Sequence, residues 1–302
     1  MPLLAVPNVS EGRELKKVDR LVDSFLDPAA LLDFHFDEVH NRTTMTVAGA
    51  SEPLRSSLET GARTALEEID MSAHEGAHPC IGALDVCPAV YLREEDRAEA
   101  HELAAEIGRW IGDELEVPVF LYGELGASDE RRERAHFRDG GLGRLAARME
   151  GGELVPDFGP TRPHPTAGAT LVTARPPLAA FNVFLDSPDP RLARVVAAGL
   201  RESGGGLPGV RAIGLPFEGV TQVSTNVHDP FSVPLGLVVE EVRKLAGPLG
   251  AQATSAEIVG LVPEASLREF PGDVAFVDPD LNSHLLERRL AALGGGSPAL
   301  DQ

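Results

Sequence analysis

Short apolar runs alternate with longer amphipathic segments along the chain. In the first half, apolar runs of strand length are bounded by turn residues, which predicts strands near residues 3–8, 30–36, 43–49, 83–92 and 117–123. Between these runs, apolar residues recur every three to four positions, which predicts helices over residues 13–26, 52–69 and 94–113. The pattern is that of a mixed α/β chain.

The second half of the chain repeats this order of elements. Its pattern predicts strands near residues 169–174, 179–186, 209–216, 219–227 and 252–261, with helices over 189–203 and 233–247. Because a βαββαβ series forms a sheet whose helices cover one face, we expect an α/β (α+β) fold of two similar ferredoxin-like subdomains with the helices outside. The expected subdomains are residues 1–166 and 167–302, with a ligand where they meet.

A proline-rich stretch joins the two series. Arg131 to Arg148 carries many Arg and Glu residues and is typical of a solvated helical face. The run from Pro156 to Pro165 then breaks regular structure, but it lacks the Gly and Ser of a flexible linker and its prolines stiffen the backbone. This composition favours an ordered loop that crosses between the halves, with a simple connector as the alternative.

Charge narrows the classes of partner. The 302 residues include 27 Lys plus Arg and 47 Asp plus Glu, a net charge of −20, which repels nucleic acid and anionic lipid surfaces. An anionic small molecule therefore needs a locally basic site.

No apolar run has the length of a membrane span, and the start Met1-Pro2-Leu3-Leu4 lacks the basic flank of a secretory signal. We therefore expect a cytoplasmic protein without a membrane partner. Cys80 and Cys87 lack CxxC spacing, which predicts two reduced thiols.

The stretch from His74 to His78 matches the zinc-hydrolase pattern H-E-x-x-H, but we expect no metal there. Gly76 lies inside the pattern and Pro79 follows it, and both disfavour the helix that would place the two imidazoles on one face. A loop between a helix and a buried strand is the better interpretation. In such a loop His78 is a candidate general acid or base, while an ordinary hydrogen-bonded histidine stays open.

Polar residues interrupt several otherwise apolar strands. Buried polar groups need partners, which either the backbone or a ligand can supply, and the sequence leaves both alternatives open. The interrupting residues are Asn8, Ser10, Glu11, Asp85, Asn182, Gln222, Ser224, Thr225 and Asn226.

Several of these residues belong to short motifs that run in one order over nearly the whole chain. The motifs are Val6–Arg13, Asn41–Thr43, His74–Pro79 with Ile81–Pro88, Pro156–Pro160, Ala180–Asn182, Gln222–Asn226 and Val259–Pro263. Taken together they resemble the formiminotransferase domain family. The resemblance implies two similar α/β subdomains with a folate tunnel between them, and a chain that is the monofunctional, homodimeric form.

The resemblance also implies an activity and a site. The activity is transfer of the formimino group from N-formimino-L-glutamate to N5 of tetrahydrofolate in histidine degradation, with tetrahydrofolate as co-substrate and no metal. The catalytic histidine of the family falls on His78. Its folate-contacting segment falls on Gly159, Pro160, Thr161, Arg162, Pro163, His164, Pro165, Thr166, Ala167 and Gly168. This chain carries His35, Cys80 and Ala167 where the family commonly has Asp, Arg and an aromatic residue.

The remaining residues receive weaker roles. Arg42, Arg13 or Arg162 could pair with substrate carboxylates, because a guanidinium donates two parallel hydrogen bonds to them. Hydrogen bonds to the pterin or the amidine could come from Asn8, Glu11, Asp85, Asn182, Gln222 and Asn226.

The transfer needs one proton taken from the attacking amine and one given to the departing nitrogen, and a neutral His78 could do both. Formyl transfer between 5-formyltetrahydrofolate and glutamate, and folate binding without catalysis, stay open as alternatives.

Overall fold

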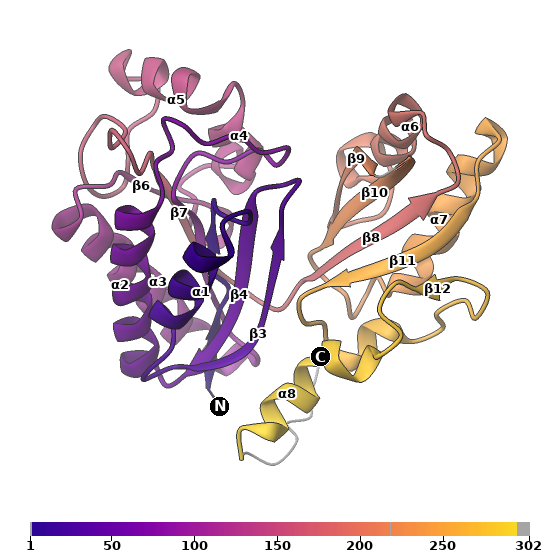
Figure 1. The fold of residues 1–302 in the computed structure, drawn as a ribbon, viewed down its shortest axis with the longest axis horizontal. Coiled ribbons are helices and arrows are strands. Elements are labelled where there is room, and N and C mark those ends of the chain that lie inside the picture. Colours follow the sequence, from indigo (N-terminus) through magenta and orange to yellow (C-terminus); the bar gives the residue numbers. More distant parts are fainter. Residues whose placement is uncertain (1, 218, 295–302) are drawn as a thin grey trace. The chain divides into compact units, whose positions relative to one another are not determined.

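The chain folds as two units, Met1–Arg175 and Pro176–Gln302 (Figure 1). The computed structural model describes residues 2–217 and 219–294. Among these residues, no helix is both long and apolar enough to cross a membrane.

An antiparallel sheet with two helices forms the first part of the N-terminal unit. The short strands β1 and β2 follow each other along the same edge of β4. Strand β4 pairs with β3 on one side and with β1 and β2 on the other, and β1 and β2 in turn pair with β5. This order confirms the predicted βαββαβ unit with ferredoxin-like topology. The elements are β1 (Leu3–Ala5), β2 (Asn8–Val9), α1 (Leu15–Ser24), β3 (Ala30–Asp37), β4 (Arg42–Gly49), α2 (Ser51–Glu68) and β5 (Leu84–Val90).

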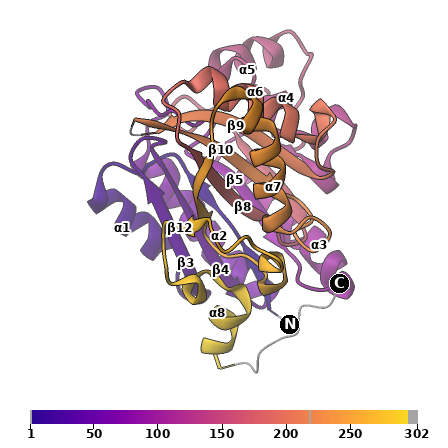
Figure 2. The ribbon, with the colours of Figure 1, turned by 90° about the vertical axis from the view of Figure 1, so that its right-hand side faces the viewer.

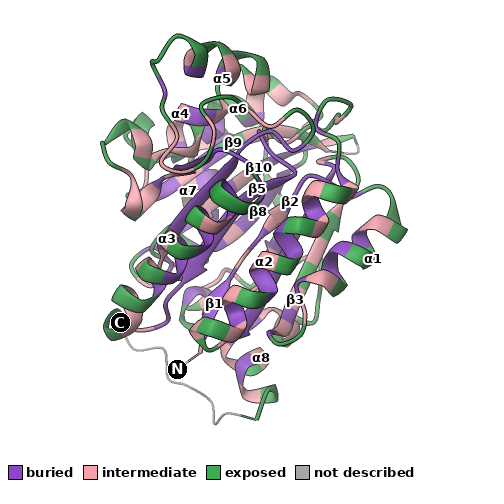
Figure 3. Cartoon of the chain, turned by 90° about the vertical axis from the view of Figure 1, so that its left-hand side faces the viewer, coloured by how far each residue is buried: buried purple, intermediate pink, exposed green. Residues whose placement is uncertain are grey.

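Two further strands extend this sheet in parallel. Strand β7 pairs with β5 and then with β6, so the edge reads β5-β7-β6. The helices α1, α2 and α3 contribute to one apolar core, and Figure 3 shows the buried positions of α2 and α3 turned toward the strands. The added elements are α3 (Arg97–Glu114), β6 (Val119–Leu121), α4 (Arg134–Arg138), α5 (Gly141–Glu150) and β7 (Thr170–Arg175).

Helices α4 and α5 cover the opposite face of the extended edge. Neighbouring residues of a strand point to opposite faces. Val172 belongs to the core under α3, whereas Leu171 packs in a separate cluster with Phe137 of α4 and Leu145 of α5. The short helix α4 is therefore held against the sheet by Phe137, which is fully buried.

The strand expected at residues 169–174 is present, but it does not begin the second unit. Because β7 hydrogen-bonds to β5 and β6, the chain divides after Arg175 and not after residue 166. Parallel strands are joined by a long crossover, here residues 91–169. No local pattern in the sequence indicates that β7 pairs with β5 across this distance.

The C-terminal unit has the predicted βαββαβ order. Its sheet runs β12-β11-β8-β10-β9, and β8, β9, β10 and β11 pair antiparallel. Helices α6 and α7 cover one face of it (Figure 2). The elements are β8 (Ala179–Leu185), α6 (Pro190–Leu200), β9 (Val210–Phe217), β10 (Val220–Val227), α7 (Leu235–Ala246), β11 (Ala253–Val259), β12 (Ala275–Phe276) and α8 (Leu286–Ala292).

Close packing between α1 and α2 depends on a glycine. A Cβ at Gly61 would overlap the ring of Phe25, which is fully buried beside α1. We therefore expect Gly61→Ala to lower the free energy of unfolding by about 1–3 kcal/mol, because overpacking a core outweighs the helix propensity of Ala. Urea denaturation followed by circular dichroism measures it.

Gly143 in α5 is the matched control. It is exposed and nothing lies within 4 Å of an added Cβ, so Gly143→Ala should stabilise the protein by about 0.5–1 kcal/mol. Equal effects of the two substitutions would contradict the packing argument.

Candidate active site

The segment from His74 to His78 is a loop. Helix α2 ends at Glu68, and residues 74–78 have no helical turn, which confirms the predicted loop. The two histidines therefore do not lie on one helical face as zinc hydrolysis requires. Within residues 2–217 and 219–294, no group of three or more His, Cys, Asp or Glu side chains is placed to hold a metal ion.

Asn41 fixes the conformation of this loop. Its Nδ2 donates to the carbonyl of Glu75 at 3.0 Å and lies 3.3 Å from Nδ1 of His74, while its Oδ1 accepts from the amide of Gly12 at 2.9 Å. The amide of Ala77 donates to the carbonyl of Val39. Asn41 itself has a positive φ of 49°, a conformation that Asn tolerates better than most residues. The loop that carries His78 is thus tied to the turn between β3 and β4.

His78 is partly buried and neutral. Its Nδ1 is buried without a hydrogen-bond partner in the described part of the chain, and its ring lies edge-on to His40 with centroids 6.1 Å apart. Burial, followed by the positive charges of Arg42 and Arg138, lowers the pKa of His78 to about 2. The imidazole is therefore neutral at any physiological pH.

Asp85 of β5 is the fully buried centre of a charge cluster. Its Oδ2 accepts from Nη1 of Arg42 at 2.8 Å and from Nη2 of Arg138 at 2.5 Å, and its Oδ1 accepts from the amide of Ile81 at 2.9 Å. Burial opposes ionisation, but Arg138 and Arg42 outweigh it and hold the pKa of Asp85 below its ordinary value. The carboxylate stays charged and orients both guanidinium groups.

Two predicted binding residues are engaged by the protein itself. Asn8 accepts from Nε of Arg42 and donates to the carbonyl of Val6, so it positions Arg42. Glu11 accepts from the amides of Arg13 and Glu14 and so fixes the turn that leads into α1. Asn8 is thus part of the cluster, and the Glu11 carboxylate has a structural partner.

The segment Gly159–Gly168 is an ordered loop, as its prolines predict. It leads into β7 within the N-terminal unit, so the expectation that it crosses between the two halves was wrong. The backbones of His164 and Gly168 exchange hydrogen bonds of 2.8 and 3.0 Å, and Nδ1 of His164 accepts from the amide of Ala167. Gly168 has a φ of 71° and lies against the carbonyl of Ile81, where a Cβ has no room. Thr161, Arg162, Pro165 and Thr166 are exposed, and Pro160, Pro163 and His164 are partly exposed.

This loop lies against the segments on both sides of the His78 loop. The amide of Met71 donates to the carbonyl of Thr166, and the amide of Ala83 donates to the carbonyl of Ala167. The structure thus brings the predicted folate segment next to the residues that precede and follow His78.

The three candidates of the C-terminal unit share one face of its sheet. Asn182 pairs in register with Ser224, and Gln222 and Asn226 lie two residues to either side of Ser224 on the same strand. The helices α6 and α7 pack on the other face, through Val183 and Val223 among others. Nδ2 of Asn182 donates to Glu257, whereas Oε1 of Gln222 is buried and has no partner among the described residues.

The sequence interpretation missed two arginines of α4. Residues 131–148 were expected to form a solvated helical face, but Arg138 binds the buried Asp85, and burial lowers the pKa of Arg134. The i, i+4 spacing of Arg134 and Arg138 places them on one side of the helix, and the apolar Phe137 beside them is the one local signal of burial.

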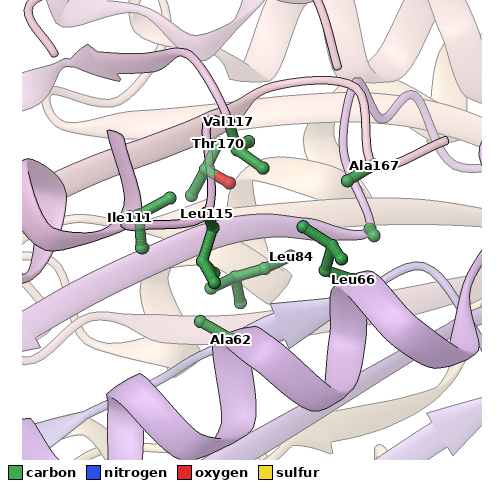
Figure 4. A pocket seen from close by; sticks show the side chains of 9 residues that line it. Ala62, Leu66, Leu84, Ile111, Leu115, Val117, Ala167 and Thr170 are labelled. Carbon is green, nitrogen blue, oxygen red and sulfur yellow. The ribbon is translucent and has the colours of Figure 1, made fainter. Parts of the chain in front are cut away.

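A small apolar void in the N-terminal unit is too small to be a binding site (Figure 4). Its volume is about 10 Å³, room for one water molecule at most. Its lining consists of Ala62, Leu66, Ala83, Leu84, Ile111, Leu115, Val117, Ala167 and Thr170.

Comparison with known proteins gives the same family for both units. The model described as "Formiminotransferase domain, N-terminal subdomain" matches residues 3–175, and "Formiminotransferase domain" matches residues 180–271. Glutamate formimidoyltransferase of Streptococcus pyogenes serotype M1 is 33% identical over 94% of this chain and 97% of its own length. The protein of the same name from Thermoplasma acidophilum is 34% identical over 94% and 96%. Mouse formimidoyltransferase-cyclodeaminase is 38% identical over 87% of this chain and 50% of its own length.

The low pKa of His78 makes the folded state sensitive to acid. Below pH 6.5 the unfolded chain binds a proton at this side chain and the folded chain does not, so stability falls as the pH drops toward 2. At pH 5 the loss from this one group is about 2 kcal/mol. His78→Asn should therefore lose about 2 kcal/mol less than the unaltered protein between pH 7.5 and pH 5.

Guanidinium denaturation at the two pH values measures this difference. An equal loss of unfolding free energy in the unaltered protein and in His78→Asn would show that the imidazole of His78 has the same pKa in the folded and the unfolded chain.

Proposed function

The chain belongs to the formiminotransferase domain family, and we propose that it transfers the formimino group of N-formimino-L-glutamate to N5 of tetrahydrofolate. The products are 5-formimino-tetrahydrofolate and glutamate, a step of histidine degradation. The observation that carries the proposal is the neutral, unpartnered imidazole of His78 beside a surplus of positive charge.

The reaction needs one group that takes up a proton and later gives it back, and the imidazole of His78 can serve as that group. Tetrahydrofolate supplies the nucleophilic nitrogen, which loses a proton when the new bond to carbon forms. The glutamate nitrogen gains a proton when its bond to that carbon breaks. His78 is neutral and so has a lone pair for the first proton, and it can return that proton to the departing nitrogen. The carboxylates of the substrates offset the positive charges of Arg42 and Arg138 that otherwise disfavour the imidazolium.

The surroundings of His78 match anionic substrates. Both substrates carry carboxylates at neutral pH, whereas the chain as a whole has a net charge of −20. The cluster of Arg42, Arg138 and Arg134 supplies the locally basic site that an acidic protein needs in order to bind them.

The loop Gly159–Gly168 fits a folate-contacting role. Its exposed side chains, Thr161, Arg162 and Thr166, are hydrogen-bond donors, and its backbone is fixed against the segments next to His78. A fixed loop lowers the entropy lost on binding, and holding two reactants together contributes an effective molarity of about 10⁵ M or more.

Loss of the imidazole should stop turnover but not binding. We expect His78→Ala to reduce kcat by about 10²- to 10⁴-fold, because general acid-base catalysis contributes that much. The affinity for tetrahydrofolate should change by less than about threefold, since the predicted folate loop is untouched. Absorbance of 5-formimino-tetrahydrofolate gives the rate, and fluorescence quenching under anaerobic conditions gives the affinity.

The matched control is His101→Ala, which replaces an imidazole on α3 that pairs with Glu124. It should retain the activity of the unaltered protein. A parallel assay with 5-formyltetrahydrofolate and glutamate tests formyl transfer. Folate binding without turnover of either donor, in correctly folded protein, would overturn the proposed activity in favour of a non-catalytic binding protein.

A further inference from the structure

The arginines near His78 carry more positive charge than their protein partners neutralise. Arg42, Arg138 and Arg134 each carry one positive charge, and the carboxylate of Asp85 supplies one negative charge. Two positive charges are left next to a neutral imidazole. Because unbalanced charge away from water costs free energy, this composition calls for an anion.

The same side chains have unused hydrogen-bond donors. The side chain of Arg138 is only 9% exposed, and its Nε is buried without a partner in the described part of the chain. Nor does any hydrogen bond or ion pair with residues 2–217 or 219–294 engage the guanidinium of Arg134. Buried donors without partners are rare in folded proteins, so Nε of Arg138 indicates a ligand, and the partly exposed guanidinium of Arg134 is free to bind the same ligand.

The arginines expected from the sequence to bind carboxylates are less available. Arg42 already donates through Nη1 to Asp85 and through Nε to Asn8. Arg13 is exposed and donates to the carbonyl of Glu38, and Arg162 is exposed on the folate loop. Arg42 keeps only Nη2 for a ligand, so most of the free donors next to His78 belong to α4.

The chemistry of the donor substrate identifies which anion suits this place. In an N-substituted glutamate the α-carboxylate is attached to the carbon that bears the reacting nitrogen. A side chain that protonates this nitrogen is within hydrogen-bond reach of it, so the α-carboxylate must lie beside that side chain. The reacting nitrogen of a tetrahydropterin has no such neighbour, because the glutamate tail of folate is at the far end of the molecule.

We propose that Arg134 and Arg138 bind the α-carboxylate of the formimino donor and so place its nitrogen beside His78. The assignment rests on the proposed function and names the donor subsite within it. Arg138 donates through one of the two nitrogens that Asp85 leaves unused, Nε or Nη1, which point to different sides of the guanidinium. Arg134 supplies a second guanidinium one helical turn away.

Arg134→Gln is the decisive variant because it breaks no ion pair within the described chain. We expect KM for formiminoglutamate to rise about 10- to 100-fold, the usual effect of losing a charged hydrogen bond, and KM for tetrahydrofolate to change less than about threefold. Arg144→Gln is the control, since Arg144 is 60% exposed on α5 and pairs only with the exposed Asp139. It should leave both KM values unchanged.

A ligand series locates the anion independently of turnover. L-Glutamate, L-glutamine, which keeps the α-carboxylate, and L-isoglutamine, which lacks it, are titrated calorimetrically into the unaltered protein and Arg134→Gln. Isoglutamine should bind the unaltered protein at least about tenfold more weakly than glutamine, and this difference should disappear in Arg134→Gln. Arg138→Lys, which keeps a positive charge beside Asp85, should show an intermediate loss of the preference for glutamine over isoglutamine.

The outcomes separate the subsite from the activity. An inactive protein that shows the glutamine preference, lost in Arg134→Gln, would remove the proposed function and keep the carboxylate subsite. A rise in KM for tetrahydrofolate instead of formiminoglutamate would assign the arginines to the folate tail and overturn the proposal. Unchanged KM values and an unchanged ligand preference in Arg134→Gln would overturn it as well.

Discussion

One buried carboxylate ties strands, helix and loop of the N-terminal unit together at the candidate active site. Asp85 lies at the centre of the sheet on β5 and binds Arg42 of β4, Arg138 of α4 and the amide of Ile81. A buried ion pair gives little net stability, but removing one partner leaves the others uncompensated at a cost of about 3–5 kcal/mol. The cluster therefore fixes where α4 and the segment after His78 lie relative to the strands.

The same charges set the chemistry of the site. Arg42 and Arg138 stabilise the anionic form of Asp85 and destabilise the cationic form of His78, so one cluster produces a permanent carboxylate and a neutral imidazole. The cluster also carries a net positive charge, although the chain as a whole has a net charge of −20. Such a local reversal of charge is what the proposed binding of a small anion to this acidic protein requires.

Much of the fold follows from local pattern, and the exceptions share a cause. The order of strands and helices was predictable because each element has its own apolar period. The prediction that residues 169–174 begin the second unit was wrong, because the parallel partner of β7 is β5, which is far away in the sequence. In the candidate site, the loop conformation of the segment that carries His78 was predictable from Gly76 and Pro79. Arg134 and Arg138 were not, because a charged helix with one apolar residue has the pattern of a solvated one.

The sequence by itself determined the two βαββαβ series, the irregular loop that carries His78 and the family to which the chain belongs. These are properties of residues close together in the chain, or of motifs in a fixed order. Only the tertiary structure decided which sheet receives β7, that Asn8 and Glu11 have protein partners, and that α4 brings Arg138 to the buried Asp85. Hydrogen bonding and charge balance depend on distances between side chains such as Asp85 and Arg138, and strand pairing sets those distances across 53 positions of sequence.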